Sequence, residues 1–591
     1  DSTKVSMQTS NASNVYGGGK GANASVGGST SVSIQSSNIV TSTDEDTGEI
    51  INGNVFGGGD QGKVFADTLI NITENTKVEG TVYGGGNRAD VDGNTSVALD
   101  SSEAGNVFGG GNAGKVNGTG KVGNDNTISS TAVSIYASKV QNDVFGGGNE
   151  GEVTGNTNVL VSTITDTIST VGNAIYGGGK AANVNGTTVV VSKGTTVKNV
   201  FGGGDLGQVT TNTKVLIDNS EISNNVYGGG NGLAASTAGN PGQITGNVEL
   251  VIRNEATVGN CSFGGGQGVT AVVNGDIDVT IESNSTVTND AYGGGDNGPV
   301  NGGTSVYLTN ANVGGNAYAA GNGTSALVKK NSYILSEGTT KVGLSIFGGG
   351  NAAETGDGVT DVLAIVDIAG GDIGGNVYGG ANSSVIFGST VVNVGEKAIN
   401  DYYGEEKGFE KGKIHIAQTI YGGGEQMDPT KEFNYDTISV TGTILINVDG
   451  EGYETSATDT NTIDIMGDIF GSGNASSANT NGDINVRNYG ARTNPKRGVS
   501  IQRATTVIID NASLLLNGTT DSTSSHPDGL FSLNRIDNLI VKNNSTLFLV
   551  NGANLLGSYH SMLGEDGAEE LAVVTIKDTV IGENGVMYEA I

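Results

Sequence analysis

Apolar and polar residues alternate in short runs along almost the whole chain. The clearest examples are residues 30–39 (TSVSIQSSNI), 213–222 (TKVLIDNSEI) and 277–287 (IDVTIESNSTV), where aliphatic residues stand two positions apart. Residues two apart in a β-strand lie on the same face, so Val32 and Ile34 share one face of their strand. No segment shows the periodicity of an amphipathic helix. The pattern therefore predicts an all-β protein.

An aromatic residue followed by three glycines, or by a close variant such as YAAG, recurs along most of the chain. The fifteen rings are Tyr16, Phe56, Tyr83, Phe108, Phe145, Tyr176, Phe201, Tyr227, Phe263, Tyr292, Tyr318, Phe347, Tyr378, Tyr421 and Phe470. Successive rings are at least 25 residues apart, the separation of Tyr83 and Phe108. A fixed motif at such intervals predicts stacked repeats rather than one globular core.

Each repeat contains three parts: the ring motif, a short piece that ends in Val and a turn, and one alternating strand. The second part is seen in residues 87–95 (NRADVDGNT) and 149–157 (NEGEVTGNT). Three short strands in about 25 residues match one coil of a parallel β-helix, whereas a propeller blade needs four strands in about 40–45 residues. We therefore expect a parallel β-solenoid with a right-handed coil, about 25 residues per coil, and loops inserted wherever the interval is longer.

Changes in the motif divide the chain into three regions. The ring motif extends through residues 1–484. Basic residues interrupt the pattern in 485–505, and alternating strands without glycine triplets resume in 506–591. We predict a repeat solenoid in the first region, a basic insertion in the second, and C-terminal coils or a related cap in the third.

The charge balance is strongly acidic. Lys and Arg supply 29 residues against 61 Asp and Glu, which gives a formal net charge of −32. This sign disfavours a nucleic-acid partner or adhesion to an anionic membrane, and no apolar run reaches the roughly 20 residues of a membrane span. We interpret the acidity as a source of solubility. The alternative is weak Ca²⁺ binding by Asp60, Asp205, Asp296 or the 41–49 loop.

Other chemistry has little support in the sequence. The single cysteine, Cys261, cannot form an intrachain disulfide, and His415, His526 and His560 lack the spacing of a metal site. The glycine triplets do not match a phosphate-binding GxxxxGK[ST] loop, and no GxSxG nucleophile elbow is present. We expect no catalytic residue in the repeat region and no cofactor beyond weakly held Ca²⁺.

Two arrangements of the rings are open from the sequence. In the first, the rings of successive coils stack as a ladder, and the glycines allow either positive φ or the close approach of another backbone. In the second, the rings point outward as an aromatic strip that stacks on sugar rings. The binding residues of this strip would be Tyr16, Phe56, Tyr83, Phe108, Phe145, Tyr176, Phe201 and Tyr227. We favour the ladder, because coil stacking demands such regular repetition.

The basic region offers a separate candidate contact. Its basic residues are Arg487, Arg492, Lys496, Arg497 and Arg503. We expect a solvated loop that contacts an anionic ligand or another molecule. The enzymatic alternative adds Asp510, Asp528 and Arg535 to form a polysaccharide-cleaving site, since such chemistry needs clustered carboxylates or carboxylates with Arg.

The repeated NVYGGGN unit, as in residues 225–231, together with the Asn, Thr and Ser richness and the acidity, resembles extracellular bacterial β-solenoid surface repeat proteins. Adhesins and pectate-lyase-like adhesive domains are the type it is most similar to. The resemblance covers the whole chain as a style of repeat and involves no diagnostic site.

The resemblance implies an extracellular or cell-surface location on a bacterium. It also implies a non-catalytic stalk or adhesin that presents loops to glycans or host surface proteins. Two alternatives stay open. One is a polysaccharide lyase or glycoside hydrolase built on a β-helix. The other is a subunit of an extracellular filament, associating end to end through the open edge of its first coil.

Overall fold

A computed structural model of the chain describes residues 1–43, 50–120, 129–164, 166–395, 410–425 and 440–449, and a series of strands between 463 and 588. In this part of the chain the regular structure consists of strands and turns, without a helix. It accordingly contains no helix long and apolar enough to cross a membrane. The all-β prediction is confirmed.

The described chain forms two compact units. The first comprises residues 1–280, 284–288 and 294–302, and the second comprises 281–283, 289–293 and 303–591. Both are built of parallel β-coils, and the chain makes about 13 turns of about 29 residues each. The predicted parallel β-solenoid is confirmed. The mean coil is longer than the 25-residue minimum because several coils carry inserted loops.

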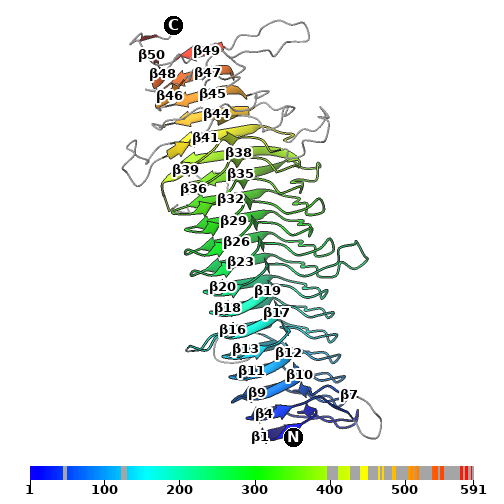
Figure 1. The fold of residues 1–591 in the computed structure, drawn as a ribbon. Coiled ribbons are helices and arrows are strands. Elements are labelled where there is room, and N and C mark those ends of the chain that lie inside the picture. Colours follow the sequence, from blue (N-terminus) through cyan, green and yellow to red (C-terminus); the bar gives the residue numbers. More distant parts are fainter. Residues whose placement is uncertain are drawn as a thin grey trace. The chain divides into compact units, whose positions relative to one another are not determined.

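One long strand per coil forms a parallel sheet within each unit (Figure 1). The first unit contains β1 (Thr3–Gln8), β4 (Thr30–Gln35), β9 (Thr68–Thr73), β11 (Thr95–Asp100), β13 (Thr131–Tyr136), β16 (Thr157–Ser162), β18 (Thr188–Lys193), β20 (Thr213–Asp218), β23 (Val248–Arg253) and the start of β26 (Ile277–Glu282). The second contains β29 (Thr304–Thr309), β32 (Ser332–Glu337), β35 (Val362–Ile368), β38 (Gly388–Gly395), β41 (Ile444–Asp449), β44 (Gly482–Arg487), β45 (Ala504–Asp510), β47 (Ile536–Lys542) and β49 (Val573–Ile576).

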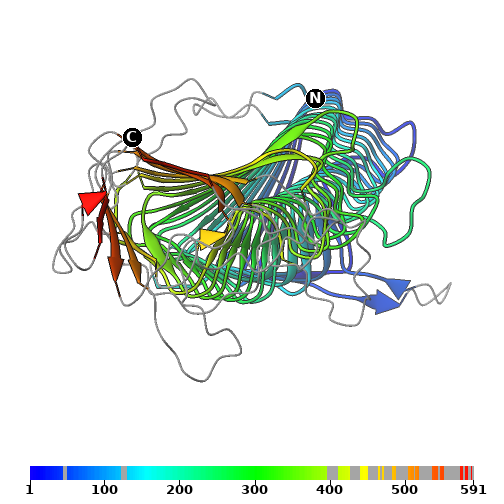
Figure 2. The same ribbon diagram turned by 90° about the horizontal axis from the view of Figure 1, so that it is seen from above.

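Two columns of shorter strands complete the coils (Figure 2). The first column consists of β2 (Asn11–Ala12), β5 (Asn38–Ile39), β14 (Lys139–Val140), β21 (Glu221–Ile222), β24 (Thr257–Val258) and β27 (Thr286–Val287), and in the second unit of β30 (Asn312–Val313), β33 (Lys341–Val342), β36 (Gly371–Ile373), β39 (Ile414–Ile416) and β42 (Ile463–Ile465). The second column carries the rings, on β3 (Val15–Tyr16), β8 (Val55–Phe56), β15 (Asp143–Phe145), β22 (Val226–Tyr227) and β25 (Ser262–Phe263), and in the second unit on β28 (Ala291–Tyr292), β31 (Ala317–Tyr318), β34 (Ile346–Phe347), β37 (Val377–Tyr378), β40 (Ile420–Tyr421) and β43 (Ile469–Phe470).

Some strands depart from this plan. In four coils a single strand spans both short columns: β10 (Lys77–Tyr83), β12 (Glu103–Phe108), β17 (Thr170–Tyr176) and β19 (Thr196–Phe201). An inserted antiparallel pair is formed by β6 (Ser42–Thr43) and β7 (Ile50–Ile51). Near the C-terminus, β46 (Ser513–Asn517), β48 (Thr546–Val550) and β50 (Val580–Gly582) make a parallel sheet, on which β51 (Met587–Tyr588) is antiparallel.

Neighbouring coils pair in the same register, which places like residues beside each other. Between β4 and β9, Val32 lies opposite Ile70 and Ile34 lies opposite Ile72. All four side chains are fully buried, while the residues between them lie on the outer face. The alternating pattern of the sequence therefore identifies the interior of the coil correctly.

A buried hydroxyl at the start of most long strands crosses the interior of its own coil. The Thr131 hydroxyl donates to the Gly146 carbonyl at 2.6 Å, and Thr188 donates to the Gly202 carbonyl at 2.6 Å. In each case the acceptor belongs to the first glycine after the ring. Leaving a buried carbonyl without a partner costs about 1–3 kcal/mol. The hydroxyl therefore fixes the backbone after the ring relative to the start of the long strand in the same coil.

The motif glycines serve the close approach of successive coils. In the described residues no motif triplet contains a glycine with positive φ. A Cβ built on Gly84 would overlap the carbonyl oxygen of Gly109 in the next coil, and one on Gly85 would lie 2.8 Å from the nitrogen of Gly111. Of the two uses predicted for the glycines, close backbone approach is the one present. Positive φ occurs instead after the long strands, for example at Ser101 (φ 50°).

Substituting Gly84 with Ala should strongly destabilise the first unit, because the new methyl group would overlap a backbone oxygen that cannot move without breaking the stack. We expect a loss of about 3 kcal/mol, measured by thermal unfolding followed by circular dichroism. The matched control is Gly21→Ala, since a Cβ there meets no atom within 4 Å. Equal melting temperatures for the two variants would contradict this role of the triplet.

Candidate functional site

The aromatic rings form one continuous stack within each unit. In the first unit, neighbouring rings from Tyr16 to Phe263 have centroids 4.5–5.1 Å apart and planes within 17° of parallel. In the second unit, the rings from Tyr292 to Tyr421 have centroids 4.6–4.9 Å apart. Such offset stacking is favourable beyond the area that it buries.

The stack is buried, and this corrects the aromatic-strip alternative. Phe56, Tyr83, Phe108, Phe145, Tyr176, Phe201 and Tyr227 are at most 9% exposed, and Tyr16 on the first coil is half-buried. The residue before each ring is buried as well, for example Val55 before Phe56. Neighbouring rings cover one another's faces, so the rings with described side chains offer no exposed aromatic strip for a sugar. They form the ladder that we favoured.

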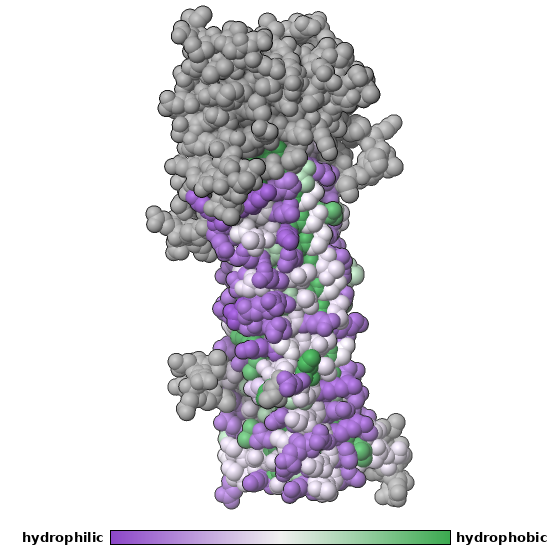
Figure 3. All heavy atoms as spheres, turned by 60° about the vertical axis from the view of Figure 1, so that its left-hand side comes forward, coloured by the Kyte–Doolittle hydropathy of each residue, from purple (hydrophilic) through white to green (hydrophobic). Residues whose placement is uncertain are grey.

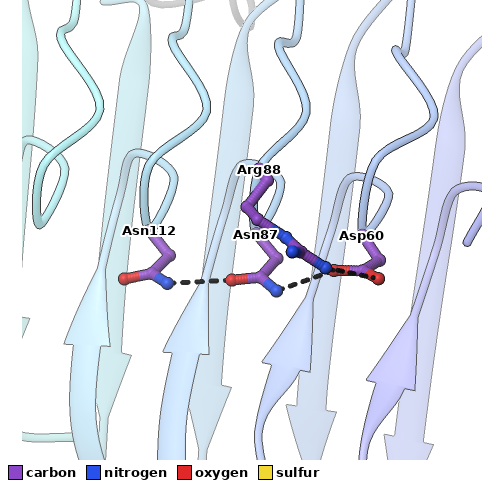
Figure 4. Close-up of polar contacts among 4 residues, drawn as sticks. All are labelled: Asp60, Asn87, Arg88 and Asn112. Carbon is purple, nitrogen blue, oxygen red and sulfur yellow. Dashed lines mark hydrogen bonds and ion pairs between the residues drawn. The ribbon is translucent and has the colours of Figure 1, made fainter. Parts of the chain in front are cut away.

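A second ladder, of Asn and Asp side chains, follows the glycines (Figure 4). The Asn112 amide donates to Asn87 Oδ1 at 2.8 Å, and the Asn87 amide donates to Asp60 Oδ1 at 2.7 Å. Arg88 also donates to both carboxylate oxygens of Asp60, at 3.1 and 3.2 Å. The Asp60 carboxylate is therefore occupied by protein donors and stabilises the corner.

The hydroxyl groups of the buried tyrosines have partners in these corners. The Asn225 amide donates to the Tyr227 hydroxyl at 3.0 Å, and Asn382 donates to the Tyr318 hydroxyl at 3.4 Å. Burial raises the pKa of both phenols well above the usual range. A tyrosine is therefore accommodated in the ladder where a nearby polar side chain satisfies its hydroxyl, as at Tyr227 and Tyr318.

Three of the acidic residues predicted as weak calcium ligands, Asp60, Asp205 and Asp296, accept hydrogen bonds from protein side chains. Asp205 Oδ1 accepts a hydrogen bond from the Asn231 amide at 2.8 Å, and burial raises the pKa of Asp205. Asp296 accepts from Asn297 at 3.1 Å. Within the residues that the structure describes, no three His, Cys, Asp or Glu side chains lie close enough to hold a metal ion. Residues 44–49 of the 41–49 loop lie outside that part, so Ca²⁺ binding there stays a prediction.

Of the basic residues, the structure describes only the backbone position of Arg487. It ends β44, opposite Asp449 of β41 on one side and Asp510 of β45 on the other. Asp510 in turn lies opposite Lys542 of β47, so charges alternate in sign along this row of the sheet. Arg492, Lys496, Arg497 and Arg503 lie outside the described residues, as do Asp528 and Arg535. A contact made by this region stays a prediction.

The sequence analysis missed a polar network on the outer face of the second unit. Asp367 of β35 is 3% exposed. It accepts from the Tyr333 hydroxyl at 3.1 Å and from the Asn393 amide at 2.6 Å, and Asn447 donates to Asn393 at 2.7 Å. Burial raises the pKa of Asp367 to about 7. The available signal was the loss of alternation in β35, where apolar residues occupy both faces.

Exposed apolar side chains are scattered over the described surface. Phe65, Leu69, Ile164, Ile168, Leu206, Leu344 and Val359 are the large hydrophobic residues that it exposes. Figure 3 shows one face, on which hydrophobic residues lie among hydrophilic and intermediate ones. Single exposed apolar residues are normal on soluble surfaces, so this distribution by itself marks no partner site.

The stacked rings predict that Phe145→Ala will destabilise the first unit by about 3–5 kcal/mol, because truncation leaves a cavity between Phe108 and Tyr176. Tyr176→Phe is the control, since it keeps the stack and removes only a hydroxyl, at a cost of about 1 kcal/mol. Calorimetric melting of the two variants measures the difference. A melting temperature unchanged in Phe145→Ala would show that stacking contributes little.

Asp367 predicts a component of stability that falls as pH rises from about 4 to about 7. The folded pKa of about 7 lies above the ordinary value of 3.8, so the folded state binds a proton that the unfolded state releases in this window. Asp367→Asn keeps an oxygen acceptor for Asn393 and cannot ionise. We expect this variant to melt near the original temperature at pH 4 and above it at pH 8. A variant less stable at pH 8 would show that the ionised carboxylate stabilises the fold.

Comparison with known proteins finds no match to this chain, whether among family models, curated proteins or solved structures. Its functional interpretation therefore depends on the geometry described above.

Proposed function

We propose that this chain is a non-catalytic extracellular scaffold of the adhesin type, which displays loops and outer-face residues for attachment to glycans or host components. The observation that carries the proposal is where the repeated residues lie. Rings, glycines and ladder amides serve the stacking of coils, and the buried threonines close each coil, whereas the sequence varies in the inserted loops and on the outer face. Binding residues held by a rigid frame commonly lie in such loops.

The insertion at residues 232–242 illustrates this division. It leaves the coil after the glycine triplet that follows β22, and residues 234–240 are exposed. Its base is tied to the coils: the Gly242 nitrogen donates to the Leu206 carbonyl at 2.9 Å, and the Thr270 hydroxyl donates to the Pro241 carbonyl at 2.8 Å. The preceding coil makes the same connection with only Leu206 and Gly207 between Asp205 and Gln208. The loop is therefore an addition to a corner that closes without it.

Filament assembly and polysaccharide cleavage stay alternative predictions, since the described residues supply no observation that favours either of them.

The scaffold proposal predicts that the whole chain binds at least one component of an array of glycans and extracellular proteins and leaves bound polysaccharides intact. Replacing residues 232–242 with Leu-Gly, the connection of the preceding coil, should shift the melting temperature by no more than about 2 °C, in line with a surface change of under about 0.5 kcal/mol. Chromatography of incubated polysaccharides checks for cleavage. Shortened polymers, absence of all binding, or collapse of the loop-replaced variant would each contradict the proposal.

A further inference from the structure

A shallow groove of about 330 Å³ lies where three successive coils of the first unit enter their long strands. Its outer lining is formed by Ser29, Ser31, Asp67, Leu69, Asn94 and Ser96. In the register of β4, β9 and β11, Ser31 lies opposite Leu69, and Leu69 lies opposite Ser96. These three residues therefore form one row on the outer face, at the strand spacing of about 4.8 Å.

The floor of the groove belongs to the scaffold. Thr30, Thr68 and Thr95 are buried, and their hydroxyls donate to the carbonyls of the ring corners. The floor is consequently held by the same bonds that fix the coil. A ligand in the groove would meet a surface that is already ordered, which lowers the entropy cost of binding.

The rim retains hydrogen-bonding capacity that the protein does not use. One Asp67 oxygen accepts from the Asn94 backbone nitrogen at 2.8 Å, which leaves the second oxygen as an acceptor. Asn94 Oδ1 accepts from the Gly120 nitrogen at 3.0 Å, which leaves its amide hydrogens. The Ser31 and Ser96 hydroxyls make no side-chain hydrogen bond within the described part of the chain. Donors and acceptors therefore surround the groove on neighbouring coils.

An apolar contact lies between these polar groups. Leu69 is 39% exposed and occupies the middle of the row, with a serine on either side. A sugar ring has the complementary chemistry, since its C–H face is apolar and its hydroxyls both donate and accept. Asp67 is the only charged group of the lining, and its carboxylate would repel an anionic ligand. Lys4 lies in the same row one coil earlier, opposite Ser31, and does not line the groove.

From this arrangement we infer that the groove binds a short segment of a neutral saccharide. Leu69 packs against a ring face, while Asp67, Asn94 and the two serines bind hydroxyl groups. The inference rests on the proposed attachment function and deepens it, because it names a ligand class and a place on the frame outside the inserted loops.

The test uses the whole chain on an array of neutral and uronate-containing glycans, followed by calorimetric titration with the strongest neutral oligosaccharide. In Ser96→Trp the indole should fill the groove and weaken binding at least tenfold. Val189→Trp is the matched control, because Val189 occupies the same outer row three coils further on, through Ala132 and Asn158. Asp67→Asn, which keeps an oxygen for the Asn94 nitrogen, should weaken binding several-fold.

The groove is overturned if Ser96→Trp binds as well as the unaltered chain, if Val189→Trp is weakened equally, or if uronates bind in preference to neutral glycans. Binding to extracellular proteins without any neutral glycan overturns the groove and leaves the attachment function standing. The opposite result is a glycan that the unaltered chain both binds and cleaves, and that Ser96→Trp no longer binds. That result would support the groove as a binding site and contradict the proposal that the chain is non-catalytic.

Discussion

Backbone hydrogen bonding between coils in one constant register is the constraint from which the other features of the structure follow. Each long strand pairs with the next so that a residue meets its counterpart in the following coil, as Val32 meets Ile70. Every side chain therefore has a neighbour of the same structural position one strand spacing away. A residue type that packs well against its own kind is therefore favoured at each position. A residue type that packs poorly against its own kind is disfavoured, because the same contact recurs between every pair of neighbouring coils.

The ladders are the direct expression of this constraint. Aromatic rings stack on other rings, and an amide can donate to the Asn or Asp side chain before it and accept from the amide after it, as Asn87 does between Asp60 and Asn112. Glycine is selected where the backbones themselves approach, because a Cβ on Gly84 would overlap Gly109. The buried threonines hold the corner and the long strand of one coil together. Stacking between coils and closure within a coil are thus separate sets of bonds.

Much of this frame can be predicted from the sequence, since its physical origin is periodic. Alternation identifies the interior at Val32 and Ile34, and the minimum ring spacing identifies the coil. Two features could not be derived. Alternation implies that Val55 and Phe56 face opposite ways, but it does not reveal that packing covers both faces of so short a strand. The burial of Asp367 on the outer face depends on tertiary surroundings, which the local pattern of β35 does not specify.

The candidate sites follow the same division. The rings were identified by repetition, and repetition turned out to indicate internal packing. The groove at Asp67 and Leu69 has no motif, because its residues come from three different repeats and differ in type from one coil to the next. A site of this kind becomes visible only when the register is known. For the same reason, the alternating charges beside Arg487 emerge from strand pairing and not from the basic run in which that residue stands.

The glycine triplets have a consequence for how surface groups are spaced. The glycines let the backbones of neighbouring coils approach to the normal spacing of paired strands, about 4.8 Å. Two groups at equivalent corners of one unit are therefore separated by whole multiples of that distance. Adding or deleting a repeat would move them by one such step without altering the chemistry of either. Equivalent surface positions therefore recur at a constant interval. A polymeric ligand whose repeat length is a multiple of that interval would meet equivalent groups along its length.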